Sequence, residues 1–121
     1  MVGDHTHIFW DCPKIQIFWK NVKEELEKIL AMDLPMDPLL FLLDVFPDHL
    51  FTTEQCYILH VLFMIARKMI TINWMKPNPP MIAQWLQKVK HVYMMEYMTA
   101  QLQLKVPIFM RRWTPVIDFL A

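Results

Sequence analysis

The N-terminal segment contains residues with the spacing of metal ligands. Cys12 follows His7 with four residues between them, and His5 lies just ahead. A structural zinc ion takes four nitrogen or sulfur ligands, which usually arrive as two short pairs. Because His7 and Cys12 form one pair and the other is missing, we expect no cofactor unless further ligands are supplied from elsewhere. The alternative interpretation is a frayed N-terminus whose Phe9 and Trp10 pack against the first helix.

The C-terminal half of the chain combines basic and aromatic side chains. Residues 1–54 hold four lysines and ten acidic residues, a net charge of −6, whereas residues 55–121 hold eight basic and two acidic residues, a net charge of +6. Basic side chains neutralise phosphates and aromatic rings stack on unpaired bases, which is how single-stranded nucleic acid is commonly bound. The candidate nucleic-acid-binding residues are Lys88, Lys90, Lys105, Arg111, Arg112, Trp85 and Tyr97. The alternative is that the two halves neutralise each other in the fold and that the aromatic rings belong to the core.

The residues that could act as acids or bases in catalysis have no nucleophile beside them in the sequence. Asp44, Asp48 and His49 come closest to a hydrolytic cluster, but no nucleophile adjoins them, so we interpret them as a polar rim. The chain contains no serine, which excludes a Ser-His-Asp triad, and its single glycine cannot form a phosphate-binding loop. His60 lies alone in an apolar segment and is expected to be a core histidine. We therefore expect no enzymatic activity.

Length and composition favour one helical domain. The 121 residues allow a single core, and 55% of them are hydrophobic. One glycine and nine prolines favour helices separated by proline-containing breaks over turn-rich β structure. No secretory signal is recognisable, and His60, Arg67 and Lys68 interrupt the longest apolar stretch, which falls short of the roughly 18 uninterrupted residues of a membrane span. We expect a protein that is intracellular, nuclear or cytoplasmic, and neither secreted nor membrane-bound.

Hydrophobic periodicity predicts an all-α fold, a small irregular helical bundle. Its three main helices cover about 13–31, 52–74 and 80–105, with short helical pieces near 38–44 and 115–120. Residues 1–121 are expected to form a single domain, with a frayed remnant of a Cys/His knuckle at 1–12. The segment 52–74 is apolar nearly all round, which is typical of a buried helix on which the others pack.

Local signals define several helix ends. Asp37 is placed to cap a short helix that follows it. Thr52 and Gln55 have the spacing of a reciprocal capping pair at the start of the middle helix. Pro107 is expected to end the long third helix, and Pro115 to open the last short helical piece.

Five stretches stand in a recognisable order between about His5 and Leu120. They read HTHIFWDCPKIQIFWKNV, LPMDPLLFLLDVFP, ARKMITINW, KPNPPMIAQWLQKVKHVYMMEYMTA and FMRRWTPVIDFL. The most specific parts are the H-I-F-W-D-C-P start, the A-R-K-x-I…W segment and the V-Y-x-M-E-Y-x-T-A stretch. In these stretches the chain resembles the C-terminal end of the endonuclease/reverse-transcriptase polyprotein of LINE-class non-LTR retrotransposons.

The resemblance implies a helical segment that follows the polymerase, binds RNA without sequence preference and assists target-primed insertion. The family carries a zinc-knuckle-like motif of two cysteines, a histidine and a final cysteine, and His7 and Cys12 match its last two positions. The first two cysteines would precede Met1, which is therefore expected to be a start created by truncation. The endonuclease and polymerase domains are missing, so the resemblance implies no enzymatic activity for this chain.

Three interpretations of the function remain. The first is a non-catalytic fragment that binds RNA or other single-stranded nucleic acid weakly and without sequence preference. The second is an orphaned interaction module that normally packs on the reverse-transcriptase domain and can self-associate, since the chain has 11 methionines and methionine packs adaptably. The third is a translated pseudogene remnant with no selected role.

Overall fold

The structure consists of α-helices. The computed structural model describes residues 10, 12–47, 49–73 and 80–120. The helices are α2 (Pro13–Leu30), α3 (Pro38–Leu43), α4 (Thr53–Asn73), α5 (Ile82–Leu102) and α6 (Val106–Leu120). No strand occurs in this described part. The predicted all-α bundle is therefore confirmed, while the expected Cys/His remnant lies mostly outside the described residues.

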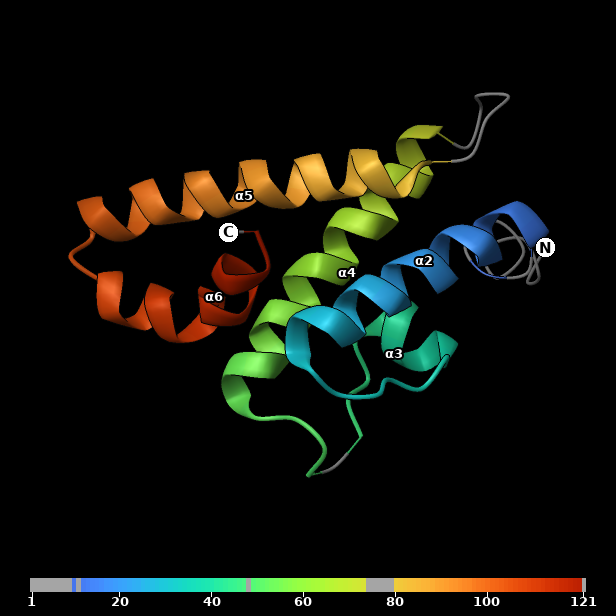
Figure 1. Ribbon diagram of the computed structural model, residues 1–121, viewed down its shortest axis with the longest axis horizontal. Helices are drawn as coiled ribbons and strands as arrows, with labels where there is room; N and C mark the ends of the chain where they lie inside the picture. Colours follow the sequence, from blue (N-terminus) through green and yellow to red (C-terminus); the bar gives the residue numbers. More distant parts are fainter. Residues whose placement is uncertain (1–9, 11, 48, 74–79, 121) are drawn as a thin grey trace.

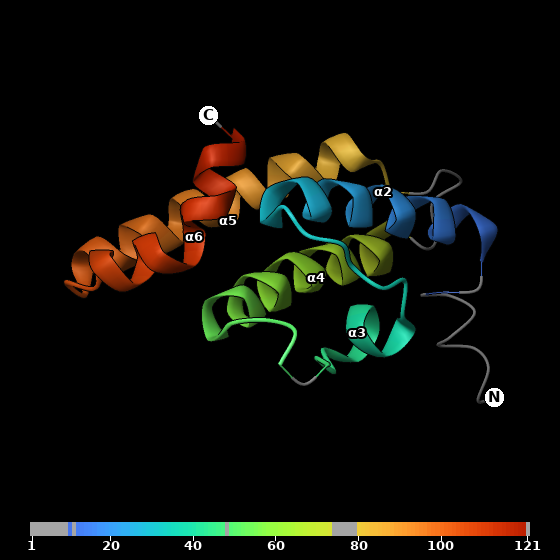
Figure 2. The same cartoon turned by 60° about the horizontal axis from the view of Figure 1, so that its bottom comes forward.

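Helix α4 is the central element of the bundle. It contacts α2, α3, α5 and α6. In Figure 1 it runs through the middle of the molecule, with α5 along the upper edge and α6 below the C-terminal half of α5. Figure 2 shows α4 between α2 and α3. The prediction that the other segments pack on the middle helix is confirmed.

The N-terminal end of α4 is fixed by the predicted capping pair. The backbone N–H of Thr52 donates to Gln55 Oε1 (2.9 Å), and that of Gln55 donates to Thr52 Oγ1 (3.1 Å). One narrow stripe of the helix faces solvent, because His60, Met64 and Lys68 are exposed at four-residue intervals. The expectation of a helix buried all round is wrong along this stripe, and so is the expectation of a core position for His60.

Helix α4 also has the size of a membrane span. Within the described residues it is long and apolar enough to cross a membrane, judged by length and composition alone. Half of its most apolar window is buried inside the bundle. The core helix of a bundle passes the same test, because a helix that is packed on several sides is apolar on several sides.

Aromatic side chains form the centre of the core between α2, α3 and α4. Trp19 is fully buried, and its ring centroid lies 5.3 Å from that of Phe41 and 6.4 Å from that of Phe63. Trp10 lies 6.2 Å from Trp19, which confirms its packing against the first helix, whereas Phe9 lies outside the described residues. Such tilted and edge-on ring pairs hold the three helices together.

Polar contacts to the backbone hold the connection between α2 and α3. Glu27 Oε2 accepts the N–H of Leu34 (2.8 Å) and lies 3.2 Å from Lys23 Nζ. The hydrogen bond from Leu34 lowers the pKa of Glu27. Burial opposes this shift, and Lys23 adds to it. Asp37 Oδ1 accepts the N–H of Leu39 (3.0 Å), so the predicted cap of α3 is confirmed.

The C-terminal part of the chain differs most from expectation. Helix α5 is shorter than the predicted 80–105, and after three residues the 15-residue helix α6 covers the segment expected to hold a turn and a short piece at 115–120. Pro107 lies in the first turn of α6, where a missing N–H is tolerated. Pro115 lies inside α6, and the helix bends towards its C-terminal end in Figures 1 and 2, as an internal proline produces.

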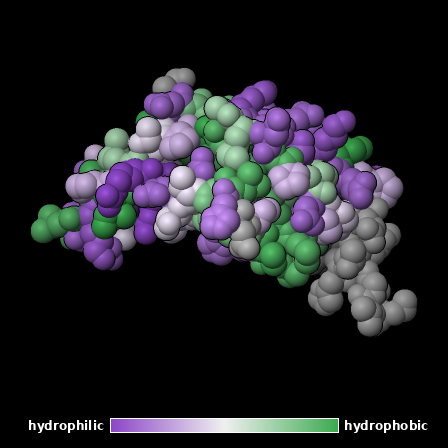
Figure 3. Space-filling model, turned by 90° about the horizontal axis from the view of Figure 1, so that it is seen from below, coloured by the Kyte–Doolittle hydropathy of each residue, from purple (hydrophilic) through white to green (hydrophobic). Residues whose placement is uncertain are grey.

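Some hydrophobic side chains remain exposed. Figure 3, a view from below, shows a hydrophobic area over α3, where Leu39 and Leu43 are exposed. The left-hand tip in this view is formed by the turn between α5 and α6 and is also hydrophobic. Leu102 and Leu104 of this region are 86% and 89% exposed.

Candidate nucleic-acid interface

The five predicted basic residues do not share one surface. Lys88 and Lys90 are exposed on α5, but two residues turn a helix by about 200°, so they leave it on opposite sides. Lys105 follows the other end of α5, about 20 Å away along the helix axis. The structure therefore divides the predicted cations into a pair on the N-terminal half of α5 and a group near its C-terminal end.

Lys105, Arg111 and Arg112 gather where α5, α6 and the start of α4 meet. Lys105 and Arg112 line a pocket of about 320 Å³ between these helices. Arg111 and Arg112 line a smaller pocket of about 200 Å³, beside Thr53 and Glu54 of α4. Arg112 belongs to both pockets, so Lys105 and Arg111 each share a pocket lining with it. We call these three side chains the basic corner.

A carboxylate in the larger pocket joins three helices. Glu96 of α5 accepts the hydroxyl of Tyr57 of α4 (2.7 Å) through Oε1 and the indole N–H of Trp113 of α6 (2.6 Å) through Oε2. The guanidinium carbon of Arg112 lies 4.0 Å from the centre of the Tyr57 ring, a cation–π contact. Both oxygens of Glu96 are thus engaged, and the ring of Tyr57 holds Arg112 in place.

Tyr57 is kept in its neutral form by these surroundings. Burial, followed by the hydrogen bond and the negative charge of Glu96, raises the pKa of the Tyr57 hydroxyl to about 12. The positive charge of Arg112 acts in the opposite direction and is the smaller effect. The hydroxyl therefore remains a hydrogen-bond donor to Glu96 at physiological pH.

The two predicted stacking residues have different positions. Trp85 is fully buried, and its indole N–H donates to the carbonyl of Leu62 (3.2 Å). It offers no ring face to a base, so the structure favours the core interpretation of Trp85 over the stacking one. Tyr97 is 37% exposed, and its ring centroid lies 5.3 Å from that of Phe109 of α6. Part of the Tyr97 ring is therefore accessible.

Tyr57, Glu96 and Trp113 lie at the centre of the larger pocket, and residue type and spacing alone did not indicate them as site residues. The sequence did mark Glu96 as unusual, because it is the only acidic residue in the range 80–117. It also falls on the apolar stripe of α5, where a carboxylate needs hydrogen-bond donors. The identity of those donors depends on the fold and could not be read from local spacing.

No protein-family model and no solved structure matches this chain. The relation to the retrotransposon segment, which the order of motifs suggests, stays a proposal.

The predicted half-site for zinc is described only at Cys12. This thiol is free and partly buried, next to the N-terminal end of α2. His5 and His7 lie outside the described residues. Within the described part of the chain, no three His, Cys, Asp or Glu side chains gather closely enough to hold a metal ion. The expectation that His7 and Cys12 are half of a zinc site, which binds no metal unless further ligands are supplied from elsewhere, stays a prediction.

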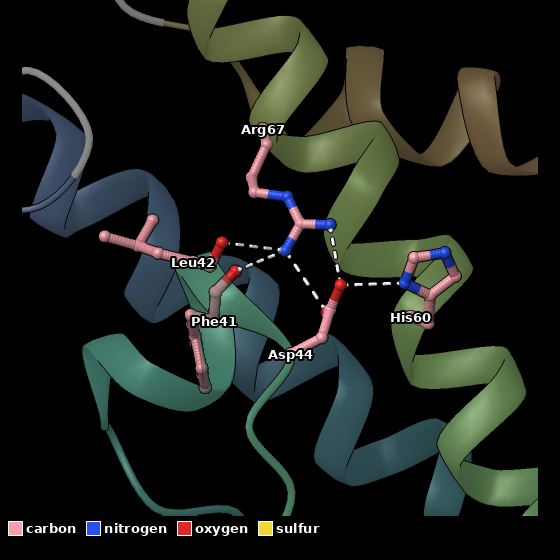
Figure 4. A network of polar contacts seen from close by, with 5 residues as sticks. All are labelled: Phe41, Leu42, Asp44, His60 and Arg67. Carbon is pink, nitrogen blue, oxygen red and sulfur yellow. Dashed lines mark hydrogen bonds and ion pairs between the residues drawn. The ribbon is translucent and has the colours of Figure 1, made fainter. Parts of the chain in front are cut away.

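A second polar network joins the end of α3 to α4 (Figure 4). Asp44 follows α3 with a left-handed backbone (φ 55°), and its two oxygens lie 3.1 and 3.2 Å from the Arg67 guanidinium. Arg67 also donates to the carbonyls of Phe41 and Leu42, at 3.1 and 3.2 Å. These carbonyls lie in the last turn of α3, so Arg67 satisfies acceptors that the helix leaves open. His60 Nδ1 lies 2.7 Å from Asp44 Oδ2.

The network accounts for part of the expected polar rim. Asp44 is committed to holding α3 against α4. His60 is satisfied by Asp44, although its side chain is 50% exposed. His49 is exposed, and Asp48 lies outside the described residues. The contacts of Asp44 are thus structural ones.

Proposed function

We propose that this chain is a non-catalytic, intracellular segment that binds single-stranded RNA and is related to the C-terminal end of a non-LTR retrotransposon reverse-transcriptase protein. The RNA lies on the basic corner, and its sequence is not read. The observation that carries the proposal is that Arg112 lines two pockets, with Lys105 in the lining of one and Arg111 in the lining of the other. The order of motifs along the chain supports RNA over other anionic partners.

A partly accessible ring lies beside a side chain of the larger pocket. Tyr97 contacts Phe109, and Phe109 lines the same pocket as Lys105 and Arg112. Glu96, the acidic residue of that pocket, already accepts two hydrogen bonds and so presents less free negative charge to a phosphate. Cations bind phosphates and rings stack on bases whatever the base, so this arrangement supports binding without sequence preference.

The salt dependence of binding tests the proposal. For single strands, the logarithm of affinity falls with log[salt] with a slope of about −0.7 per phosphate neutralised, so three cations give a slope of about −2 for an oligouridylate. The double variant Lys105→Ala/Arg111→Ala leaves one cation and reduces the slope to about −0.7. Fluorescence anisotropy of a labelled oligonucleotide between about 50 and 200 mM salt measures both values. Arg112 is left in place because it also packs on Tyr57.

Two matched double variants control for net charge. Lys14→Ala/Lys20→Ala removes two exposed lysines of α2, and Lys88→Ala/Lys90→Ala removes the separate pair on α5. We expect both to leave the slope near that of the parent chain. The proposal fails if no binding is detected at about 50 mM salt, or if all three double variants reduce the slope equally.

A further inference from the structure

The outer side of α5 carries a row of exposed hydrophobic residues. Met94, Met98 and Leu102 recur every four residues and are 55%, 60% and 86% exposed. Met95, beside them, is 55% exposed. Residues four apart lie on one side of an α-helix, so these four side chains form one surface, which we call the methionine row.

The opposite side of α5 makes the contacts with the bundle. Trp85, Val89 and Ala100 are the buried residues of this helix, and helical rotation places them away from the methionine row. In Figure 1 the C-terminal half of α5 lies along the upper edge of the molecule, with α6 below it. The described part of the chain therefore leaves the row uncovered. A contiguous exposed hydrophobic patch of this kind is typical of an interaction site.

The charges around the row are positive. Lys88 and Lys90 leave α5 on opposite sides shortly before the row begins, and Lys105 follows its end. In the range 80–117 the only acidic residue is Glu96, whose two oxygens are bound inside the pocket described above. A partner that covers the row therefore meets lysines at both ends, and α5 itself presents no free carboxylate beside the row.

We infer that the methionine row docks an acidic amphipathic helix of a partner protein. A ridge of side chains four residues apart fits the groove between similar ridges of a second helix, which favours a helix over an extended segment. Methionine adapts its shape to such a groove. Carboxylates that flank the apolar side of the partner face Lys88, Lys90 and Lys105. This inference goes beyond RNA binding and does not depend on it.

A second copy of this chain fits the row less well. Two rows packed against each other bring the lysines of both copies to one interface, whether the helices run parallel or antiparallel. Like charges placed together in an interface oppose association. An acidic partner removes this repulsion and replaces it with attraction.

A display selection against the whole chain tests the inference. The library presents a helical scaffold with one randomised face, and binders are selected on the parent chain alone. We expect enriched sequences to carry apolar residues at three- and four-residue spacing with aspartate or glutamate beside them. The consensus peptide, labelled for anisotropy, should bind Met98→Glu at least about tenfold more weakly, and Met64→Glu within about twofold of the parent. Met64 is the matched control because it is 45% exposed on α4.

The remaining outcomes are also decisive. A weaker complex with Lys88→Glu/Lys90→Glu supports the acidic partner, and an unchanged complex overturns it. Enrichment of basic sequences, or an equal effect of the Met98 and Met64 substitutions, overturns the docking surface. Sedimentation velocity of the chain alone adds one further test: a dimer that Met98→Glu dissolves assigns the row to self-association and overturns the acidic partner.

Discussion

At the scale of single residues, Glu96 organises the larger pocket. Its carboxylate binds a hydroxyl from α4 and an indole N–H from α6, which lie 39 and 17 positions away in the chain. Tyr57 is thereby fixed, and its ring supports Arg112. One acidic side chain thus determines where a cation of the basic corner lies.

The raised pKa of Tyr57 gives this contact a signature at alkaline pH. Since the pKa moves from 10.0 to about 12, the folded chain holds the hydroxyl proton more tightly than the unfolded chain does. The stability that Tyr57 contributes is therefore complete below pH 10.0 and is lost as the pH rises through about 12. Ultraviolet titration of tyrosinate should show one step near pH 12 that Tyr57→Phe abolishes. A Tyr57 step near pH 10.0 in the folded chain contradicts the bond to Glu96.

Residue contacts were predictable from the sequence only where they are local. The caps of Thr52 and Asp37 were predicted because each bonds a backbone N–H no more than three positions away. Lys105, Arg111 and Arg112 were identified by residue type, but their separation from the two lysines of α5 depends on how the helices are arranged. The hydrogen-bond partners of Glu96 likewise depend on how the helices are arranged.

At the scale of elements, the turn between α5 and α6 places a leucine in a left-handed backbone conformation that favours glycine. Leu104 has φ 58° and is 89% exposed. This left-handed conformation costs a non-glycine residue roughly 1 kcal/mol, and an exposed side chain gains little packing in return. Leu104→Gly is therefore expected to raise the free energy of unfolding by about 0.5–1 kcal/mol, measured by denaturant titration.

Leu102→Gly is the matched control for this substitution. Leu102 is similarly exposed, at 86%, but is the last residue of α5 and has no positive φ. Glycine costs up to about 1 kcal/mol at a helical position, so this variant should be less stable than the parent. Two variants that shift stability in the same direction are not compatible with a left-handed Leu104.

Helix α6 shows why one element was mispredicted. Pro107 and Pro115 were interpreted as breaks, yet the first lies in the opening turn and the second inside a bent helix. Phe109, Trp113 and Val116 are buried, so packing of one side of α6 compensates for the hydrogen bond that Pro115 cannot make. The positions of α2 and α5 followed from hydrophobic periodicity, that of α4 from its long apolar segment, and that of α3 from the cap at Asp37. No proline falls inside these four helices beyond the first turn.

At the scale of the whole molecule, Asp44 connects the acidic and the basic half of the chain. Among the described residues, the ion pair of Asp44 with Arg67 and its hydrogen bond with His60 join residues 1–54 to residues 55–121, whereas the other two ion pairs lie within α2. Direct pairing therefore neutralises little of the charge difference between the halves. The basic half retains cations that face solvent, which composition alone could not establish.

Loss of the contact between Arg67 and Asp44 should lower the stability of the fold. Arg67→Met leaves Asp44 without its partner and removes the donor to two carbonyls of α3, so the free energy of unfolding should fall by about 2–3 kcal/mol. Lys68→Met removes a neighbouring exposed lysine and should change the stability by less than about 0.5 kcal/mol. Denaturant titration compares the two variants. Equal losses argue against a stabilising role for the contacts of Arg67.

The methionine row has a chemical consequence as well. Thioethers at the surface are oxidised to sulfoxides, which are polar and chiral, and reductases can reverse the change. Met94, Met95 and Met98 are open to oxidants, while Met69 in the core is only 5% exposed. Mild peroxide stress should therefore oxidise the methionines on the outer side of α5 before those of the core. A partner helix bound to the methionine row would then be released while the bundle stays folded.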